Sequence, residues 1–342
     1  MHGSIHLFDR LPQVNASEKA DGCTARSPVR DNPLVGLIRN ARSHRNLRGE
    51  AASHIPEGVL LRLPEKRSEL PGILAEFAER QVDCIAIDGG DGTVRDVLTC
   101  GTSVFGDCWP TLMVVPNGKT NALALDLGLP TDWTLADAIA ALRAGNVARR
   151  HPLVISLRDN PQAQVRGFIM GAGVFNRCIA LGQRSHDLGA FNGAAIGVTA
   201  VWSVMQALLG SATNPWRKGT HMSVRQGDGR EVPHYGGLPA NERYLLFAST
   251  LKEFPAGLDP FRGREEPLCM AVLDNPRRGL LLRIASLMRG TASEAMLKRG
   301  GHVVGDTTME LDIAESFILD GEAFPSGYYQ ISAGAPLHFV VA

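Results

Sequence analysis

A short run of glycines around one acidic residue is the part of this sequence best suited to chemistry. Gly89-Gly90-Asp91-Gly92-Thr93 follows the apolar run Ile85-Ala86-Ile87. Glycines let a ligand approach the backbone closely, and a helix that starts here would offer unpaired N–H groups to an anion. A carboxylate beside phosphate groups needs a cation between them, which Mg²⁺ supplies. The run therefore predicts a phosphate cradle with a magnesium ion. A plain tight turn with Asp91 as a helix cap is the alternative.

Strands and helices alternate around this run, which is typical of a doubly wound parallel sheet. Apolar runs predict buried strands, and apolar residues at helical spacing predict helices. We expect strands at 34–38, 82–87 and 111–115, and helices at 67–80 with Ser68 as cap, at 93–98, from about 120, and at 135–143. The glycine run would then lie at the carboxyl edge of the sheet, where α/β folds bind phosphates.

The pattern changes near residue 151 to short β-rich runs separated by turns, which predicts a mostly antiparallel β-sandwich. The expected strands are 153–157, 167–170, 222–225, 244–248, 268–273, 309–313, 317–319, 329–331 and 337–341, with helices near 192–209 and 278–298. We therefore divide the chain into a flexible leader (1–32), an α/β domain (33–150) and a β-rich domain (151–342). The last strands could return to the first domain.

Four segments resemble, in order, the motifs of the diacylglycerol kinase catalytic-domain family, which includes sphingosine, ceramide and bacterial lipid kinases. The glycine run is similar to the family's signature, although NAD kinases and phosphofructokinase-like enzymes have similar runs. Val115–Ala124 resembles the second nucleotide loop, and Phe168–Phe175 resembles the strand that opens the second domain. Gly301-His302 with Leu319-Asp320-Gly321-Glu322 resembles the C-terminal motifs. The resemblance covers about residues 33–340. It implies a phosphofructokinase-like nucleotide domain and a lipid-binding β domain.

The sequence also departs from the family pattern. The first loop reads Asn40-Ala41-Arg42-Ser43-His44, where the family has asparagine-proline-x-serine-glycine. Lys119 stands at a position that is usually threonine, next to Thr120. Arg95 and Asp96 follow the glycine run where the family often has asparagine and glutamate. These changes affect nucleotide contacts and substrate choice more than the fold.

The resemblance implies ATP-dependent transfer of the γ-phosphate to the primary hydroxyl of a membrane lipid, either diacylglycerol or ceramide, with ATP and Mg²⁺ as cofactors. Asp91 would hold the metal, directly or through water, or would orient the lipid hydroxyl, and Glu322 would be the general base. An ordinary hairpin turn is the alternative for Asp320-Gly321-Glu322. His302 is a phosphate contact or a structural histidine. The implied ATP contacts are Asn40, Ser43, Gly89, Gly90, Asp91, Gly92, Thr93, Gly118, Lys119, Thr120 and Asn121.

Apolar side chains at helical spacing, among them Val201, Trp202 and Met205, predict either core packing or a wall around acyl chains. Asn176 stands where some family members have an aspartate that contacts the lipid head, so the resemblance disfavours an amino-bearing sphingoid base. Residues 188–216 carry no formal charge and are long enough for a membrane span. Their amide side chains and glycines favour a buried or lipid-touching helix instead.

A basic segment at residues 277–302 offers a second link to lipids. It contains Glu294 as its one acidic residue and six cationic residues: Arg277, Arg278, Arg283, Arg289, Lys298 and Arg299. Leucines and an isoleucine lie between them, and a basic amphipathic segment suits an anionic membrane surface. A solvated structural helix is the alternative.

Composition narrows the remaining classes. The 35 basic and 35 acidic residues cancel, which argues against a nucleic-acid partner. Six scattered cysteines without a C-x-x-C indicate reduced thiols in the cytoplasm, and no signal peptide is recognised. We expect a cytoplasmic protein that associates peripherally with membranes, and a homodimer is left open. Two alternative functions remain. One is a NAD kinase-like enzyme, although Asn241-Glu242, which resembles the Asn-Glu pair of that family, lies too late in the chain. The other is a catalytically inactive lipid or nucleotide sensor.

Overall fold

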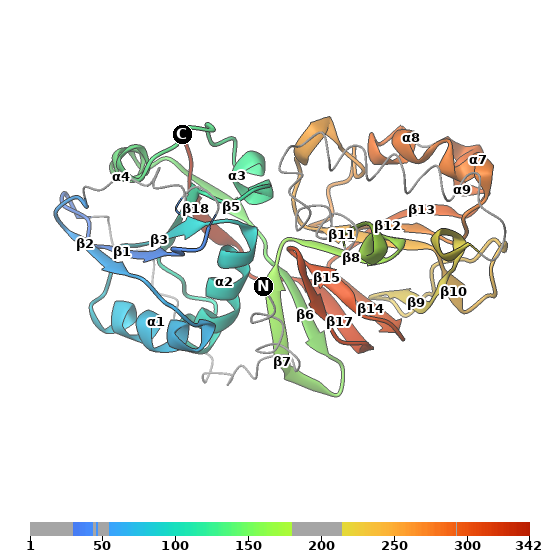
Figure 1. Ribbon diagram of the computed structural model, residues 1–342, viewed down its shortest axis with the longest axis horizontal. Helices are drawn as coiled ribbons and strands as arrows, with labels where there is room; N and C mark the ends of the chain where they lie inside the picture. Colours follow the sequence, from blue (N-terminus) through green and yellow to red (C-terminus); the bar gives the residue numbers. More distant parts are fainter. Residues whose placement is uncertain (1–29, 44–45, 47–54, 180–213, 292) are drawn as a thin grey trace.

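The computed structural model describes residues 30–43, 46, 55–179, 214–291 and 293–342. Most of the expected leader, the expected helix at 192–209, and Val201, Trp202 and Met205 lie outside these residues. The described chain forms an α/β domain beside a domain of antiparallel sheets (Figure 1). This confirms the predicted fold class.

The α/β domain is built on a six-stranded sheet with the order β2-β1-β3-β4-β18-β5 in the described chain. Neighbouring strands pair in parallel except for β5, which is antiparallel to β18. The C-terminal strand β18 returns to this sheet, where it lies between β4 and β5. The strands are β1 (Val35–Arg39), β2 (Val59–Arg62), β3 (Cys84–Gly89), β4 (Thr111–Pro116), β5 (Val147–Arg150) and β18 (Leu337–Val340).

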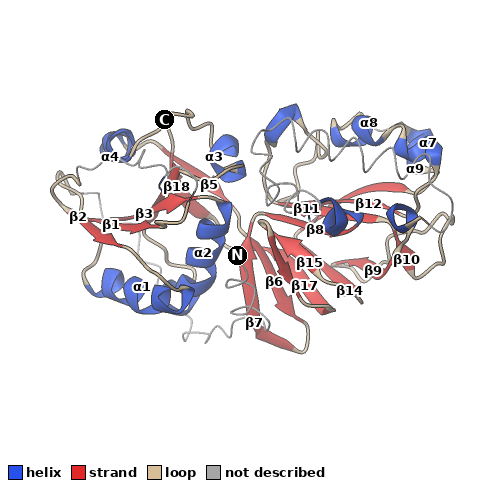
Figure 2. Cartoon of the chain, viewed as in Figure 1, coloured by secondary structure: helices blue, strands red, loops and turns tan. Residues whose placement is uncertain are grey.

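Helices cover both faces of this sheet, as Figure 2 shows. Leu74 of α1 (Leu70–Glu79) and Leu98 of α2 (Asp91–Phe105) pack on the face that carries Ile85. On the other face, Leu142 of α4 (Leu135–Ala144) packs near Ala86. The short helix α3 (Ala122–Asp126) follows β4. Both faces are therefore closed by apolar side chains, and the loops at the strand ends are left to form a site.

The second domain contains two antiparallel six-stranded sheets in the described chain, with a buried apolar cluster between them. One sheet has the order β10-β9-β14-β17-β6-β7, and the other has the order β13-β12-β11-β8-β15-β16. The first consists of β6 (Leu153–Leu157), β7 (Asn160–Gly167), β9 (Thr220–Gln226), β10 (Glu242–Arg243), β14 (Thr308–Ile313) and β17 (Gly327–Ala333). The second consists of β8 (Ile169–Gly173), β11 (Leu245–Ser249), β12 (Leu268–Leu273), β13 (Gly301–Asp306), β15 (Phe317–Leu319) and β16 (Glu322–Phe324).

The basic segment folds as three short helices, α7 (Arg278–Leu281), α8 (Ile284–Met288) and α9 (Glu294–Leu297), and not as the one helix expected. Gly290, with φ +65°, follows α8 in a conformation that a helix does not allow. Leucines on the inner side, such as Leu280 and Leu287, pack near Leu273 of β12. None of the helices among the described residues is long and apolar enough to cross a bilayer.

Two local expectations are wrong. Ser68 does not cap α1, which begins at Leu70 after a turn of 3-10 helix over Arg67–Glu69. The helix expected from Thr93 begins at Asp91, inside the glycine run, and extends to Phe105. The second difference matters for the site, because it places the acidic residue in the first turn of α2.

Candidate active site

Two glycine-containing loops lie next to each other at the carboxyl edge of the parallel sheet. β3 and β4 pair in parallel with Gly89 opposite Pro116, so the two strands end side by side at the same edge of the sheet. A Cβ atom on Gly90 would lie 2.9 Å from the Cα of Gly118, and one on Gly118 would come closer still to the Cα of Gly90. Only glycine permits this approach, because any side chain would force the two backbones apart.

Asp91 joins these loops through its carboxylate. Its two oxygens accept hydrogen bonds from the backbone N–H groups of Ala122, at 3.0 Å, and Leu123, at 3.2 Å. Asp91 therefore caps a helix, as the alternative interpretation expected, but the helix is α3 and not the one that Asp91 begins. Burial raises the pKa of this carboxyl above its ordinary value, against the effect of the backbone N–H groups.

The second nucleotide loop is held by Asn121. Its side chain accepts from the N–H of Gly118 at 2.9 Å and donates to the carbonyl of the same residue at 3.0 Å. Asn121 adopts the left-handed conformation, with φ +51°, which asparagine tolerates better than most residues. Lys119 and Thr120 are exposed at the tip of this loop. The loop is thus preformed, with its cationic side chain toward solvent.

The first loop approaches the glycine run from β1. The Asn40 amide donates to the hydroxyl of Thr93 at 3.0 Å, and its backbone N–H donates to the carbonyl of Asp88 at 2.9 Å. Ser43 is buried, and its hydroxyl has no hydrogen-bond partner among the described residues. A buried hydroxyl without a partner is costly unless a ligand satisfies it. All three loops therefore meet at one edge of the sheet.

Asp88 is a site residue that the sequence analysis missed. It is 2% exposed, and its carboxylate accepts from Arg39 at 2.6 Å, from Asn46 at 3.0 Å and from the side chain of Asn117. These contacts connect the ends of β1, β3 and β4. An acidic residue that closes an otherwise apolar strand directly before a glycine was the signal that could have identified it.

The second domain brings the turn of residues 320–321 to this edge. Asp320 has φ +44°, and its carboxylate accepts from the backbone N–H groups of Phe168, at 3.0 Å, and Ile169, at 2.9 Å. A Cβ atom on Gly92 would lie 3.8 Å from the carbonyl oxygen of Asp320, so the turn lies against the start of α2. Burial, and then the negative charge of Asp91, raise the pKa of the Asp320 carboxyl to about 7.

Asp91 and Asp320 are therefore two carboxyl groups from different domains that act on each other electrostatically. Like charges at close range disfavour ionisation of both groups, and a divalent cation between them would remove that repulsion. Carboxylate oxygens are ligands that Mg²⁺ prefers, and it usually completes its shell with phosphate oxygens and water. The described residues contain no group of three or more acidic, histidine or cysteine side chains that could hold a metal alone. The pair fits a magnesium ion that arrives with phosphate.

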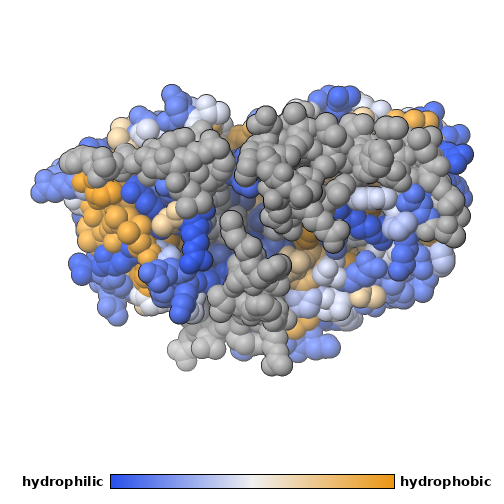
Figure 3. Space-filling view, in the orientation of Figure 1, coloured by the Kyte–Doolittle hydropathy of each residue, from blue (hydrophilic) through white to orange (hydrophobic). Residues whose placement is uncertain are grey.

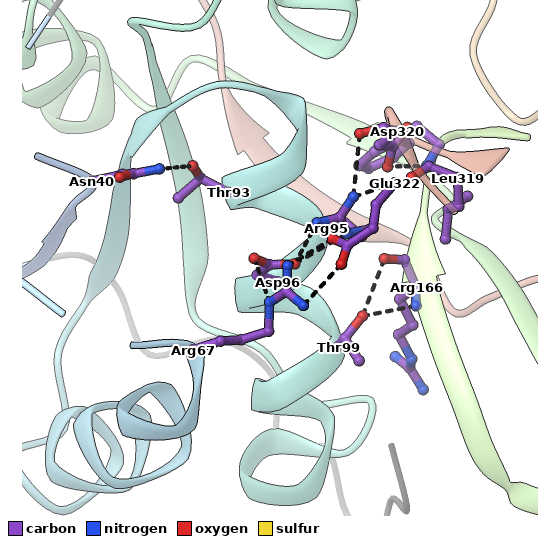
Figure 4. A network of polar contacts seen from close by, with 11 residues as sticks. Asn40, Arg67, Thr93, Arg95, Asp96, Thr99, Arg166, Leu319, Asp320 and Glu322 are labelled. Carbon is purple, nitrogen blue, oxygen red and sulfur yellow. Dashed lines mark hydrogen bonds and ion pairs between the residues drawn. The ribbon is translucent and has the colours of Figure 1, made fainter. Parts of the chain in front are cut away.

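Glu322 does not face the carboxylate pair as a free acid. Figure 4 shows it in a ring of four charged side chains, where it contacts two arginines. Arg67 donates to both of its oxygens, at 3.1 and 2.6 Å, and Arg95 donates to one of them. Asp96 lies between the two arginines, 2.7 Å from Arg67 and 2.8 Å from Arg95. The sequence analysis noticed Arg95 and Asp96 only as departures from a pattern, and it missed Arg67.

His302 has a structural environment. Its Nε2 lies 2.8 Å from the carboxylate of the fully buried Asp274, and its ring stacks on Tyr235 at 5.4 Å between centroids. Asp274 also pairs with the buried Arg243. These contacts lie within the second domain, and they favour the structural interpretation of His302 over a phosphate contact.

Of the four lipid-contacting residues expected from sequence, Asn176 alone lies in the described part of the chain. It belongs to the helical residues 174–179 that follow β8. Its amide nitrogen donates to the carbonyl of Ser316, whereas its buried amide oxygen has no hydrogen-bond partner among the described residues.

Comparison with known proteins agrees with this site. Residues 40–152, which contain all three loops, match the family model of the diacylglycerol kinase catalytic domain. Curated protein sequences give no match. Two solved structures of a candidate diacylglycerol kinase from Bacillus anthracis str. Sterne superpose with TM-scores of 0.63 and 0.62 at 16% sequence identity. A third, of a diacylglycerol kinase from the same organism, gives 0.58 at 15%. Each alignment covers 91% of this chain and 97% of the other.

The structural likeness shows the shared fold, and the family-model match over residues 40–152 supports a lipid kinase. The part of the α/β domain at residues 40–152 matches the diacylglycerol kinase catalytic-domain model. The resemblance that the sequence motifs predicted is thereby confirmed.

Proposed function

We propose that this protein is an ATP-dependent kinase that transfers the γ-phosphate to the primary hydroxyl of a membrane lipid, with diacylglycerol or ceramide as acceptor. The observation that carries the proposal is the junction of Asp91 with the turn at Asp320. The phosphate-binding edge of one domain faces an acidic turn of the other there. Phosphoryl transfer needs this kind of positioning and charge neutralisation more than it needs covalent chemistry.

The nucleotide would bind across the three loops. Backbone N–H groups at Gly89, Gly90 and Gly92 and the hydroxyl of Thr93 would hold phosphate oxygens at the start of α2, where the helix dipole favours negative charge. Gly118, Thr120 and Asn121 would form the opposite wall, and Lys119 would contact a phosphate as a point charge. The free hydroxyl of Ser43, near Asn40, supports a polar ligand on the remaining side.

Asp91 and Asp320 would hold the Mg²⁺ that accompanies ATP. The bound metal would neutralise charge on the phosphates during transfer. The chain's own contribution is to fix both carboxylates through backbone N–H groups, so that neither has to reorganise when the nucleotide binds. The resemblance suggests Glu322 as the acceptor of the hydroxyl proton, but its two oxygens are already engaged by Arg67 and Arg95.

The lipid would approach from a membrane that the basic segment contacts. Arg277, Arg283 and Arg289 are exposed there, and Leu282 between them is 71% exposed. In Figure 3 hydrophobic and hydrophilic surface alternate at the upper right, over α7–α9. Cationic side chains around an exposed leucine suit an anionic bilayer surface. An uncharged acceptor agrees with Asn176, because asparagine offers no carboxylate to an amino group.

A substrate panel tests the proposal. The full chain is incubated with ATP and Mg²⁺, and ADP is measured with anionic vesicles that contain diacylglycerol, ceramide or sphingosine, and with NAD in solution. We expect lipid-dependent ADP formation with diacylglycerol or ceramide. A response to NAD alone would assign the NAD kinase-like alternative. Nucleotide binding without turnover on any acceptor would make the protein a sensor.

A further inference from the structure

The charged network around Glu322 has more contacts than a catalytic carboxylate needs. Arg95 and Glu322 are 3% and 8% exposed, so both members of the central ion pair are removed from bulk water. The guanidinium of Arg67 and that of Arg95 together use both oxygens of Glu322. An acceptor for a substrate proton needs an oxygen within hydrogen-bond reach of the hydroxyl. Here the two arginines donate three hydrogen bonds to these oxygens, two of them to Oε2, which leaves about one of the four acceptor positions of the carboxylate for a substrate hydroxyl.

Arg95 makes further contacts that point to positioning. Its Nη1 donates to the carbonyl of Leu319 at 3.1 Å and to the carbonyl of Asp320 at 3.2 Å. Arg95 therefore binds both the backbone of the turn before Glu322 and the carboxylate of Glu322 itself, at the start of β16 (Figure 4). A planar guanidinium is suited to this, since it presents several N–H donors in a fixed arrangement.

The turn of residues 319–322, which Arg95 contacts, is the part of the second domain that lies against the start of α2. Asp320 holds a left-handed backbone conformation, with φ +44°, which aspartate tolerates better than most residues but which still costs free energy. Its N–H donates to the carbonyl of Ile169 at 2.9 Å, and its carboxylate accepts from Phe168 and Ile169. Surrounding contacts must hold such a conformation in place, and Arg95 supplies two of them.

We propose that Arg95, together with Arg67, is a positioning residue that uses Glu322 to hold the turn of residues 319–322 over the start of α2. Glu322 then anchors the turn and does not accept the substrate's proton. Asp96 balances the two arginines from the first domain. The proposal rests on the proposed kinase function for its catalytic consequences, but the anchoring itself can be tested without activity.

The chain offers a matched control in Arg243. This arginine is 1% exposed, pairs with the carboxylate of Asp274, and donates to the carbonyls of Val232 and Pro233. Like Arg95, it contacts a buried carboxylate and two backbone carbonyls, but its contacts lie wholly inside the second domain, and it has no counterpart of Asp96 among them. Arg243→Lys therefore reports what a buried guanidinium contributes to folding alone.

The first measurement is hydrogen exchange of the full chain, with Arg95→Lys, Glu322→Gln and Arg243→Lys compared with the parent. We expect Arg95→Lys and Glu322→Gln to speed exchange at the N–H groups of Phe168, Ile169 and Asp320. Exchange in β12 should stay unchanged, and Arg243→Lys should not affect the turn. Unchanged exchange at the turn in both Arg95→Lys and Glu322→Gln would overturn the proposal. If Arg95→Lys does not fold, Glu322→Asp replaces it, because the shorter acid cannot keep all three contacts.

The second measurement is turnover, Michaelis constants and the pH profile of the same variants. An anchor predicts that Arg95→Lys and Glu322→Gln lower the turnover rate by about tenfold or less. It also predicts that both raise the Michaelis constant for the lipid, and that each keeps the parent's pH profile. A general base predicts instead a loss of about 10²- to 10⁴-fold in Glu322→Gln, with the acidic limb of the profile gone and Arg95→Lys near the parent. That second pattern would overturn the proposal. A parent enzyme without transfer to any lipid would refute the kinase function, and the exchange data would still decide whether Arg95 anchors the turn.

Discussion

At the scale of single residues, Asp91 combines a structural and a chemical task. Its carboxylate caps α3 while the residue itself begins α2, so a change there affects both the loop before α3 and the charge at the candidate site. Because these two hydrogen bonds hold the start of α3, some of the protein's stability depends on Asp91.

We therefore expect Asp91→Asn to act twice. Asparagine keeps one acceptor oxygen and can bond only one of the N–H groups of Ala122 and Leu123, which should cost about 1 kcal/mol of folding free energy. Loss of the charge should lower turnover by roughly 10²- to 10³-fold, the usual effect of one electrostatic group. Thermal melting and steady-state kinetics measure the two effects. Asp137→Asn, which weakens the capping box of α4, is the control that should lose stability and keep turnover. Near-parental turnover in Asp91→Asn would remove its catalytic role.

Asp320 predicts a pH dependence of stability. An aspartate in the unfolded chain ionises near pH 4, whereas the pKa of Asp320 in the folded protein is raised to about 7. Between these values the folded protein keeps a proton that the unfolded chain has released. The stabilisation is therefore full below about pH 4 and is lost as the pH rises toward 7. Asparagine does not titrate, so the melting temperature of Asp320→Asn minus that of the parent should increase from pH 5 to pH 8. A pH-independent difference would contradict this assignment.

At the scale of elements, the glycine run shows what sequence could and could not predict. The alternation of apolar strands and helices gave the parallel sheet, because a strand buried on both faces must be apolar throughout. The two edge strands β2 and β5 were not predicted, because each has only four residues, too few to show a pattern, and their pairing depends on the neighbouring strand. The contact between Gly90 and Gly118 could not be predicted from sequence either, since it forms only when β3 and β4 are aligned in the sheet.

The three short helices of the basic segment predict a salt-sensitive membrane contact. Each cation near an anionic surface contributes about 1 kcal/mol, so Arg283→Gln with Arg289→Gln should weaken binding to anionic vesicles by roughly 30-fold at low salt. High salt should weaken binding of the parent, because the charges are screened. Vesicle sedimentation measures both effects. Arg230→Gln, at an exposed position on the β9 side of the domain, is the control. Binding that ignores both salt and the double substitution would exclude α7–α9 from the contact.

At the scale of the whole molecule, the site depends on how the two domains are joined. Asp126 at the end of α3 pairs with Arg150 and accepts from the backbone N–H groups of Lys252 and Glu253, at 2.7 and 2.9 Å. Arg95 of α2 makes a second contact between the domains, with Glu322. Contacts from both α3 and α2 therefore join the second domain to the first.

The whole-molecule arrangement also explains which site residues the sequence could not supply. The glycine run and the acidic turn could be recognised as separate motifs, each with a local pattern. Arg67 could not, because its partner Glu322 is 255 residues away and the pair forms only when the domains are docked. The role expected for Glu322 came from resemblance to other proteins. Its ion pair with Arg95 could not be expected in that way, because Arg95 stands where those proteins often have asparagine.

The central claim is that this site transfers the γ-phosphate of ATP to a lipid hydroxyl. The most direct measurement uses ATP labelled in its γ-phosphate, Mg²⁺, the full chain, and anionic vesicles that carry diacylglycerol or ceramide, followed by lipid extraction and mass analysis. The account predicts that the label enters the lipid fraction as a phosphomonoester at the primary hydroxyl, and that Asp91→Asn loses this transfer. Label that stays in ATP, or that is released only as inorganic phosphate with every lipid offered, would contradict it.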